Sequence, residues 1–204
     1  MSANVITIET FSGVAARPYV DDLARLRLDA FKEYPYLYAG NLETEITYTM
    51  PYAEIDKAMI TVAYVNNRLA GLTTGMPVDC DSLMVNDIKK ILVERGDTPT
   101  YYYYYGELIV LSEFEGRGLG QKLYETQDAL IQSQGFTHVC QITSLREEHH
   151  PLKPSNYRSL DDYWQKLGFY REHKTMSYRW PTLQTNNSVL LADNIVELWT
   201  KKLG

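Results

Sequence analysis

Apolar and polar residues alternate along some segments of this chain, and in others the apolar residues recur every three or four positions. Alternation is typical of β-strands, and the longer spacing is typical of amphipathic helices. Strands are predicted over residues 5–11, 60–65, 69–76, 101–111, 136–142, 175–180 and 194–202. Helices are predicted over residues 18–34, 43–59, 79–94, 118–134 and 160–167, the second with a proline at position 51 that can break it. The last strand stays ambiguous, because its apolar residues also fit one face of a helix.

The order of these segments, with an early hairpin around residues 66–68, indicates an α/β or α+β fold with a mixed sheet. No repeat or linker divides the 204 residues, so we expect a single domain over residues 1–204. A run of five tyrosines lies in the strand 101–111, and their side chains should alternate between the two faces of the sheet. Tyr101, Tyr103 and Tyr105 are expected on one face, and Tyr102 and Tyr104 on the other.

Composition narrows the classes of function. The net charge is −6 and no basic stripe is visible, so nucleic acid is not an expected partner. An acidic surface mildly favours a cationic substrate such as an amine. No segment approaches the roughly 18 consecutive apolar residues of a membrane span, and the first residues do not form a signal peptide. Cys80 and Cys140 are isolated from each other, which is typical of buried thiols in a reducing compartment. We therefore expect a cytoplasmic protein that binds no membrane.

Three alternating glycines, Gly116, Gly118 and Gly120, follow the strand 101–111 and precede a predicted helix. Glycine permits positive φ and a close approach of a ligand to the main chain. The N-terminus of the helix would present free N–H groups to a pyrophosphate. The spacing differs from the dinucleotide fingerprint G-x-G-x-x-G and lacks the G-K-S/T ending of a P-loop. A structural turn and a site for another nucleotide phosphate stay open as alternatives.

The segment Val110 to Gly120 resembles the acetyl-CoA loop of the GNAT superfamily of N-acyltransferases. The loop of that family has Gln or Arg, two residues of any type, Gly, one residue of any type, and then Gly or Ala. Gly118 and Gly120 match the two small positions, and Glu115 stands where the family usually has Gln or Arg.

A second segment, Leu160 to Phe169, is similar to the late helix-to-strand element of the same family, which ends in Gly-Phe. The two motifs follow each other in the family's order and at its spacing. A looser likeness over residues 31–38, at Glu45 and over residues 150–161 points to a bacterial subgroup that is largely uncharacterised.

The resemblance implies a mixed, mostly antiparallel central sheet of about seven strands, flanked by helices and splayed at its middle strands. It implies transfer of an acetyl group from acetyl-CoA to a primary amine, by direct attack within a ternary complex. The acceptor would be a small molecule or a protein, and a homodimer is compatible with the fold. A non-catalytic acyl-CoA-binding or sensing module is the alternative, because Glu115 and Trp164 depart from the family pattern.

Glu107 is the first candidate general base, because it lies on the strand before the loop, where partial desolvation would raise its pKa. The alternative is a carboxylate paired with Arg or Lys on the sheet. Many family members have a tyrosine that acts as the general acid at the position of Trp164. The indole of Trp164 has no transferable proton. Tyr157 and Tyr163 are therefore the candidate general acids, with packing as the alternative role for both.

The resemblance also assigns contacts to the two substrates. Acetyl-CoA would contact Val110, Leu111, Glu115, Gly116, Arg117, Gly118, Leu119, Gly120, Gln121, Asn156 and Trp164. The acceptor would contact Tyr36, Tyr38, Glu45 and His150. His149 and His150 adjoin two glutamates, but no second spaced set of ligands accompanies them, so no metal is expected and a solvated loop is the alternative.

Overall fold

The computed structural model describes residues 5–204 and contains a seven-stranded sheet in the order β1-β2-β3-β4-β5-β7-β6. All neighbouring strands pair antiparallel except β4 and β5, which pair parallel. The strands are β1 (Ile6–Ser12), β2 (Met59–Val65), β3 (Arg68–Pro77), β4 (Tyr102–Val110), β5 (His138–Ser144), β6 (Tyr170–Leu183) and β7 (Val189–Lys202). The expected mixed, mostly antiparallel sheet of seven strands is confirmed.

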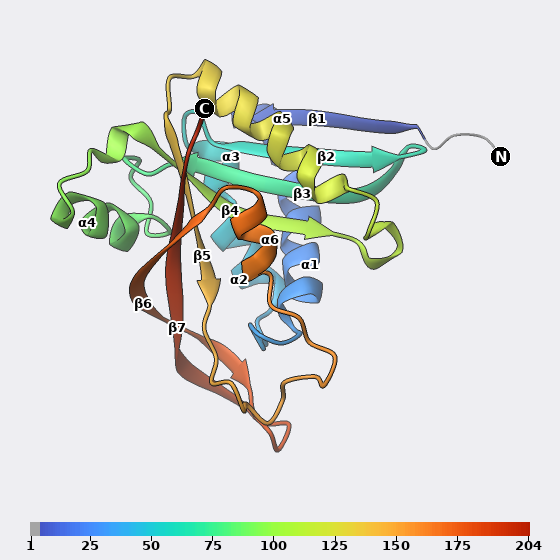
Figure 1. The fold of residues 1–204 in the computed structure, drawn as a ribbon. Helices are drawn as coiled ribbons and strands as arrows, with labels where there is room; N and C mark the ends of the chain where they lie inside the picture. Colours follow the sequence, from blue (N-terminus) through green and yellow to red (C-terminus); the bar gives the residue numbers. More distant parts are fainter. Residues whose placement is uncertain (1–4) are drawn as a thin grey trace.

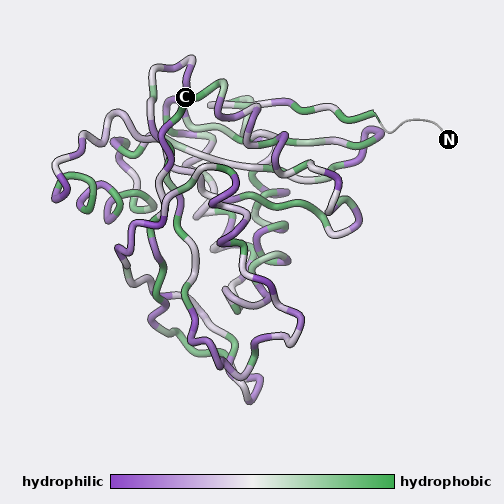
Figure 2. The backbone as a smooth tube through the Cα atoms, in the orientation of Figure 1, coloured by the Kyte–Doolittle hydropathy of each residue, from purple (hydrophilic) through white to green (hydrophobic). Residues whose placement is uncertain are grey.

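Helices cover both faces of this sheet (Figure 1). They are α1 (Val20–Phe31), α2 (Leu42–Thr49), α3 (Pro51–Glu54), α4 (Asn86–Glu94), α5 (Leu119–Ser133) and α6 (Asp161–Lys166), with 3-10 turns at Gly13–Tyr19, Pro99–Tyr101 and Ser112–Phe114. Residues of α1, α3 and α4 share one buried cluster with the sheet, and residues of α5 and α6 pack in clusters on the other face. Figure 2 shows hydrophobic and hydrophilic residues alternating along the helices, as expected for elements with one buried face.

The parallel pairing of β4 with β5 covers only Tyr102–Tyr104 opposite His138–Cys140. Beyond these residues β4 continues beside β3 as far as Val110, and β5 continues beside β7 as far as Ser144. The two middle strands therefore diverge from Tyr105 and Gln141 onward, and Figure 1 shows them separating. The expected splay of the sheet is confirmed.

A β-bulge on β4 changes which side chains face each layer of helices. Thr73 pairs with Leu108 and Gly75 pairs with Tyr105, so Gly106 and Glu107 both lie opposite Thr74. The extra residue resets the alternation along the strand, which lets a bulge re-aim a side chain. Before the bulge, Tyr102 and Tyr104 join one core cluster while Tyr103 and Tyr105 join the other, as expected. The prediction was wrong for Tyr101, which ends the 3-10 turn before β4 and is exposed. After the bulge, Glu107 faces α1 rather than α5.

Several predicted boundaries were wrong. The helix expected over residues 79–94 begins only at Asn86, after a stretch of turns. The segment 43–59 is divided by Pro51 into α2 and α3 and then enters β2. The two late strands are longer than predicted and form the hairpin β6–β7, so the helical alternative for the last segment is excluded. The added residues show no alternation of apolar and polar positions, since β7 begins with the exposed run Val189–Leu191, and pairing between the two strands extends them.

The bulge depends on the absence of a side chain at Gly106. A Cβ there would overlap the hydroxyl of Tyr52 and lie 2.8 Å from Oγ1 of Thr74. We expect Gly106→Ala to lower the free energy of unfolding by about 1–3 kcal/mol, as overpacking does in a closed core. Adding Tyr52→Phe should recover part of this loss. Urea unfolding of the single and double variants measures both values, and an unchanged midpoint for Gly106→Ala would contradict this view of the bulge.

Candidate functional site

The glycine loop joins β4 to α5 and leaves a row of main-chain N–H groups free. Gly116 and Gly118 have φ of 71° and 73°, and an added Cβ at either would meet no atom within 4 Å. Gly118 is the N-cap of α5, whose first turn cannot bond its own amides. Within residues 5–204 no acceptor takes a hydrogen bond from the amides of residues 116–121. The open loop and the dipole of a 15-residue helix therefore form a suitable site for an anion.

The charged residues around this loop are exposed. Arg117 donates to the main-chain oxygen of Glu113 at 2.9 Å, and Arg68 pairs with the Glu113 carboxylate at 2.9 Å. Glu115 is exposed, so its carboxylate can stay in solvent away from a bound anion. Gln121 bonds Glu125 at 2.7 Å, and Leu119 is buried and anchors the start of α5 in the core.

The gap between β4 and β5 begins next to this loop. Leu111, expected to bond the cosubstrate through its main chain, already donates its amide to Ala70 at 2.9 Å and accepts from Phe114 at 2.8 Å. The free edge of β4 therefore ends at Val110, one residue before Leu111, and the main-chain groups of Leu111 already have partners within the protein. An added Cβ at Gly120 would lie 3.2 Å from the hydroxyl oxygen of Tyr163, so α6 packs against the first turn of α5.

A buried ion-pair network lies on the α1 face of the gap. Nε of Arg27 is 2.6 Å from Oε2 of Glu45, and Nη1 of the same guanidinium pairs with Oε1 of Glu107. Thr74 donates its hydroxyl to the other oxygen of Glu107. Arg27 is 9% exposed, Glu45 2% and Glu107 3%. Glu107 is thus paired with an arginine. From the sequence, such a pair is the alternative to a role as general base.

The network carries an excess of negative charge, because two carboxylates share one guanidinium. In the part of the chain that the structure describes, no second cation pairs with Glu45 or Glu107. The hydroxyl of Tyr38 donates to Oε1 of Glu45 at 2.5 Å. Burial, and to a smaller extent this hydrogen bond, raise the pKa of Tyr38 far above its usual value. The Arg27 guanidinium also lies 4.4 Å from the ring centroid of Tyr48, a cation–π contact.

The other expected acceptor residues gather where the loop of residues 145–160 meets the segment after α1. The ring of Tyr34 lies 4.6 Å from that of Tyr157 and 5.8 Å from that of His150. The main-chain oxygen of Tyr36 accepts from Arg146 at 2.8 Å. Burial raises the pKa of Tyr36 to about 12 against the opposing charge of Arg27. The ring of Tyr36 lies 4.5 Å from that of Phe31, and the Arg27 guanidinium lies 4.9 Å from the same Phe31 ring, so Tyr36 is close to the buried network.

In the described part of the chain, the other residues expected in the site, Asn156, His150, Tyr157 and Tyr163, do not form one cluster of contacts with the buried network. Asn156 is exposed in the turn before Tyr157 and has no hydrogen-bond partner within residues 5–204. Nδ1 of His150 accepts a hydrogen bond from the amide of Leu152 at 3.2 Å. Burial raises the pKa of Tyr157, and Tyr34 adds to the effect. Burial also raises the pKa of Tyr163.

No protein-family model matches the sequence, and no curated protein matches it. A GNAT-family acetyltransferase from Streptococcus pneumoniae has a similar structure, with a TM-score of 0.56 at 14% identity, covering 98% of this chain and 100% of that chain. The chain has the GNAT fold. A ribosomal-protein-alanine N-acetyltransferase from Brucella melitensis gives a TM-score of 0.59 at 12% identity over 97% and 99% of the two chains. A protein from Salmonella typhimurium, solved with its cofactor acetyl-CoA, gives 0.59 at 11% identity over 98% and 95%.

Three residues near the gap were not predicted from the sequence: Arg27, Thr74 and Gln141, whose side-chain oxygen accepts from the hydroxyl of Tyr124 at 3.0 Å. Arg27 occupies the same helix face as Leu23 and Phe31, four residues away on either side, and a charge on an apolar face was the signal. Gln141 was the one amide within an apolar strand. Thr74 gave no signal, because threonine is common in strands.

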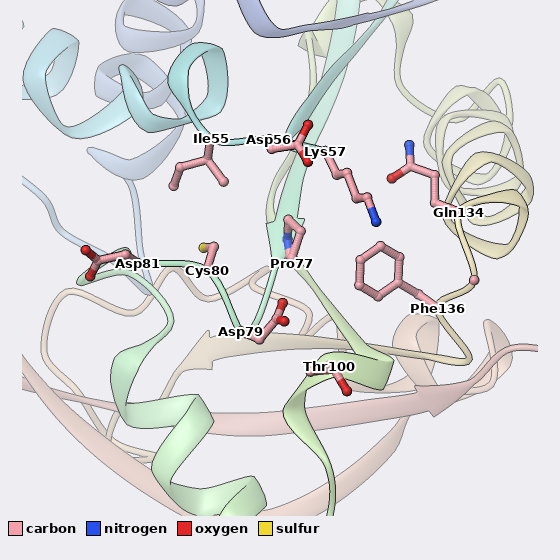
Figure 3. A pocket seen from close by; sticks show the side chains of 11 residues that line it. Ile55, Asp56, Lys57, Pro77, Asp79, Cys80, Asp81, Thr100, Gln134 and Phe136 are labelled. Atoms are coloured by element: carbon pink, nitrogen blue, oxygen red, sulfur yellow. The ribbon is translucent and has the colours of Figure 1, made fainter.

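Two hollows lie away from the glycine loop. A cavity of about 520 Å³ lies beside the C-terminal end of α5, at the opposite end of β4 from the glycine loop. Figure 3 shows Asp56, Asp79 and Asp81 around it, with Cys80, whose thiol pKa burial raises to about 11. A groove of about 770 Å³ lies between α2 and residues 81–84 and is bordered by Tyr48.

Within residues 5–204, no three His, Cys, Asp or Glu side chains are arranged to hold a metal ion. Over the same residues, no helix combines the length and apolar character that a membrane crossing needs.

Arg27 should be essential for stability. We expect Arg27→Met to lower the free energy of unfolding by about 3–5 kcal/mol, because it leaves two carboxylates buried without a cation. Lys90→Met removes an exposed pair with Asp87, 2.7 Å apart, and should cost well under about 1 kcal/mol. Urea unfolding of both variants at neutral pH measures the difference. Equal losses would show that the buried network does not stabilise the fold.

Proposed function

We propose that this protein is an acyl-CoA-dependent N-acyltransferase that moves an acetyl group from acetyl-CoA to a primary amine within a ternary complex. The observation that carries the proposal is the position of the free amides of residues 116–121 at the mouth of the gap between β4 and β5. An anion-binding helix end beside an open sheet suits a ligand with a pyrophosphate and a long, mostly uncharged arm. The GNAT fold, which a protein with bound acetyl-CoA shares, supports this choice of ligand.

In this proposal the pyrophosphate of acetyl-CoA accepts hydrogen bonds from the amides of Gly116 to Gln121, and the pantetheine arm enters the gap toward Tyr105. Gly118 matters for two reasons: its positive φ forms the turn, and its missing side chain leaves room for phosphate oxygens. Arg117 and Arg68 are exposed nearby and favour an anion, while Glu115 opposes it. Affinity for acetyl-CoA then depends chiefly on the main-chain amides.

The reaction forms one bond and breaks one. The amine nitrogen attacks the thioester carbonyl carbon, a C–N bond forms, and the C–S bond breaks with its electron pair on sulfur. The proton lost from the ammonium group needs an acceptor, and Glu107 is a carboxylate on β4, the strand that borders the gap. For this role its pairing with Arg27 has to loosen as the acceptor enters, so that the ammonium replaces one of the guanidinium contacts. Tyr157 and Tyr163 are the proposed proton donors.

The acceptor side is chemically suited to a cation. Glu45 and Glu107 share one guanidinium, so an entering ammonium group would neutralise the excess negative charge. Tyr36, Tyr38 and His150 are proposed to contact the rest of the acceptor. The groove beside α2 leads toward the ring of Tyr48 and carries Glu43 and Asp81, which also favours a positively charged acceptor, either a small amine or a protein amine.

A non-catalytic acyl-CoA-binding module is the second candidate. The ion pair of Glu107 with Arg27 favours it, because a paired carboxylate is a weaker base than a free one. Such a module would bind acetyl-CoA in the same gap but would not consume it, so turnover distinguishes the two candidates.

We expect Glu107→Gln to lower kcat with a responsive amine by about a hundredfold or more, since general base catalysis commonly contributes that much. Glu197→Gln is the matched control, because Glu197 is also a buried carboxylate, 2.5 Å from Arg171 on another part of the sheet. Release of free CoA thiol is followed with a panel of primary amines. The enzyme proposal fails if no amine gives turnover with wild-type protein, and the role of Glu107 fails if both variants keep the wild-type rate.

A further inference from the structure

Of the buried N–H donors without a partner in residues 5–204, which also include Nε2 of Gln127 on α5, two belong to residues in contact with Tyr124. They are the indole Nε1 of Trp164 and the amide Nε2 of Gln141, in residues that are 7% and 4% exposed. A buried donor without a partner loses its bonds to water and gains nothing in return, so proteins rarely leave one unsatisfied. A ligand that supplies acceptor atoms beside Tyr124 would satisfy both donors.

Both donors surround the same side chain. The hydroxyl of Tyr124 donates to Oε1 of Gln141 at 3.0 Å, and the rings of Tyr124 and Trp164 lie 5.9 Å apart. The ring of Tyr105 is 4.6 Å from that of Tyr124. Because Tyr105 and Gln141 are the first residues after the last pair of β4 with β5, Gln141 lies at the closed end of the gap, and Trp164, on α6, packs against the ring of Tyr124.

The glycine loop marks the other end of the same gap. Tyr163, next to Trp164 on α6, packs against Gly120 in the first turn of α5. In acyl-CoA the thioester is at the end of the arm that is remote from the pyrophosphate. A ligand whose pyrophosphate lies at the glycine loop and whose arm follows the gap would therefore bring its thioester to Trp164 and Gln141.

A comparison within the chain argues against a purely structural role for Trp164. Trp199 is also buried in the same core cluster, and its indole N–H donates to the hydroxyl of Thr143 at 2.9 Å. This fold thus provides an acceptor for one buried indole and none for the other. The surroundings of Trp164 are mainly the rings of Tyr124, Tyr163 and Phe169, where a single hydrogen bond to a ligand is strong because water is excluded.

We propose that Trp164 and Gln141 donate their free N–H groups to the thioester end of acyl-CoA, with Trp164 stabilising the leaving thiolate by a hydrogen bond. This inference rests on the proposed function. The indole is a donor only and keeps its proton. When the C–N bond forms and the C–S bond breaks, the electron pair goes to sulfur and the ammonium proton goes to the base. Trp164 then stabilises the CoA thiolate and lowers the pKa of the CoA thiol without giving up its own proton, and the sulfur takes its proton from Tyr157 or Tyr163.

The first test measures the pKa of the bound CoA thiol by its ultraviolet thiolate absorbance, which requires no acceptor. Trp164→Phe should raise this pKa by about one unit relative to wild type, equivalent to about a tenfold loss of thiolate stabilisation. Trp199→Phe is the matched control and should leave the thiol pKa unchanged, while it lowers the melting temperature. An equal thiol pKa in wild type and Trp164→Phe would overturn the role of Trp164.

The second test concerns Gln141 and does not depend on the folding of the tryptophan variant. Gln141→Met should weaken acetyl-CoA binding about three- to tenfold, the range expected for one lost hydrogen bond. Tyr124→Phe removes the same bond between Tyr124 and Gln141 but keeps the free amide, so it should weaken binding much less. Equal affinities for wild type and Gln141→Met would overturn the role of Gln141.

The two levels of the argument fail differently. If wild-type protein binds neither acetyl-CoA nor CoA, the proposed function fails and this inference fails with it. If wild type binds both ligands while Trp164→Phe and Gln141→Met match it in thiol pKa and affinity, only the inference about the two donors is overturned.

Discussion

The parallel contact between β4 and β5 lasts for three residues on each strand, and the rest of the candidate site is arranged around the place where it stops. Main-chain N–H and C=O groups in the middle of a sheet normally bond the next strand, because an unpaired buried group costs free energy. After Tyr104 and Cys140, β4 has a neighbour on one side only. A ligand arm can supply the missing partners, and the bulge at Gly106 and Glu107 turns a carboxylate to the opposite side of the same opening.

Electrostatics divides the site into two ends. The first turn of α5 presents free amides and the positive end of a helix dipole. The α1 face presents two carboxylates that share Arg27. An anionic cosubstrate and a cationic acceptor would therefore be drawn to different sides of the sheet and meet at the gap. With this separation, the proposed binding of a polyanion is compatible with a net charge of −6, because the amides are local and the charge of the distant surface is screened by salt.

Local chemistry explains what the sequence could predict. The glycine loop was recognisable because positive φ at Gly116 and Gly118 is a property of the residue itself. The two faces of the tyrosine run followed from the period of a strand. The network around Arg27 was not predictable, because it joins residues 27, 45, 74 and 107, whose proximity depends on the register of β3 with β4. The length of β6 and β7 depends in the same way on their mutual pairing, and the free donor of Gln141 depends on where β4 leaves β5.

Thermal unfolding with and without acetyl-CoA tests the central claim, that this opening binds an acyl-CoA. At 100 times its dissociation constant a ligand adds about 2.7 kcal/mol of stability, which corresponds to a rise of about 5–10 °C in Tm for a chain of this size. Gly118→Ala and Gly96→Ala form a matched pair, since both glycines have positive φ, 73° and 83°, and open space around an added Cβ. The account predicts a rise with acetyl-CoA and CoA, but not with ATP or NAD, that is kept in Gly96→Ala and lost in Gly118→Ala. No rise with either CoA species, or an equal rise in both variants, would contradict it.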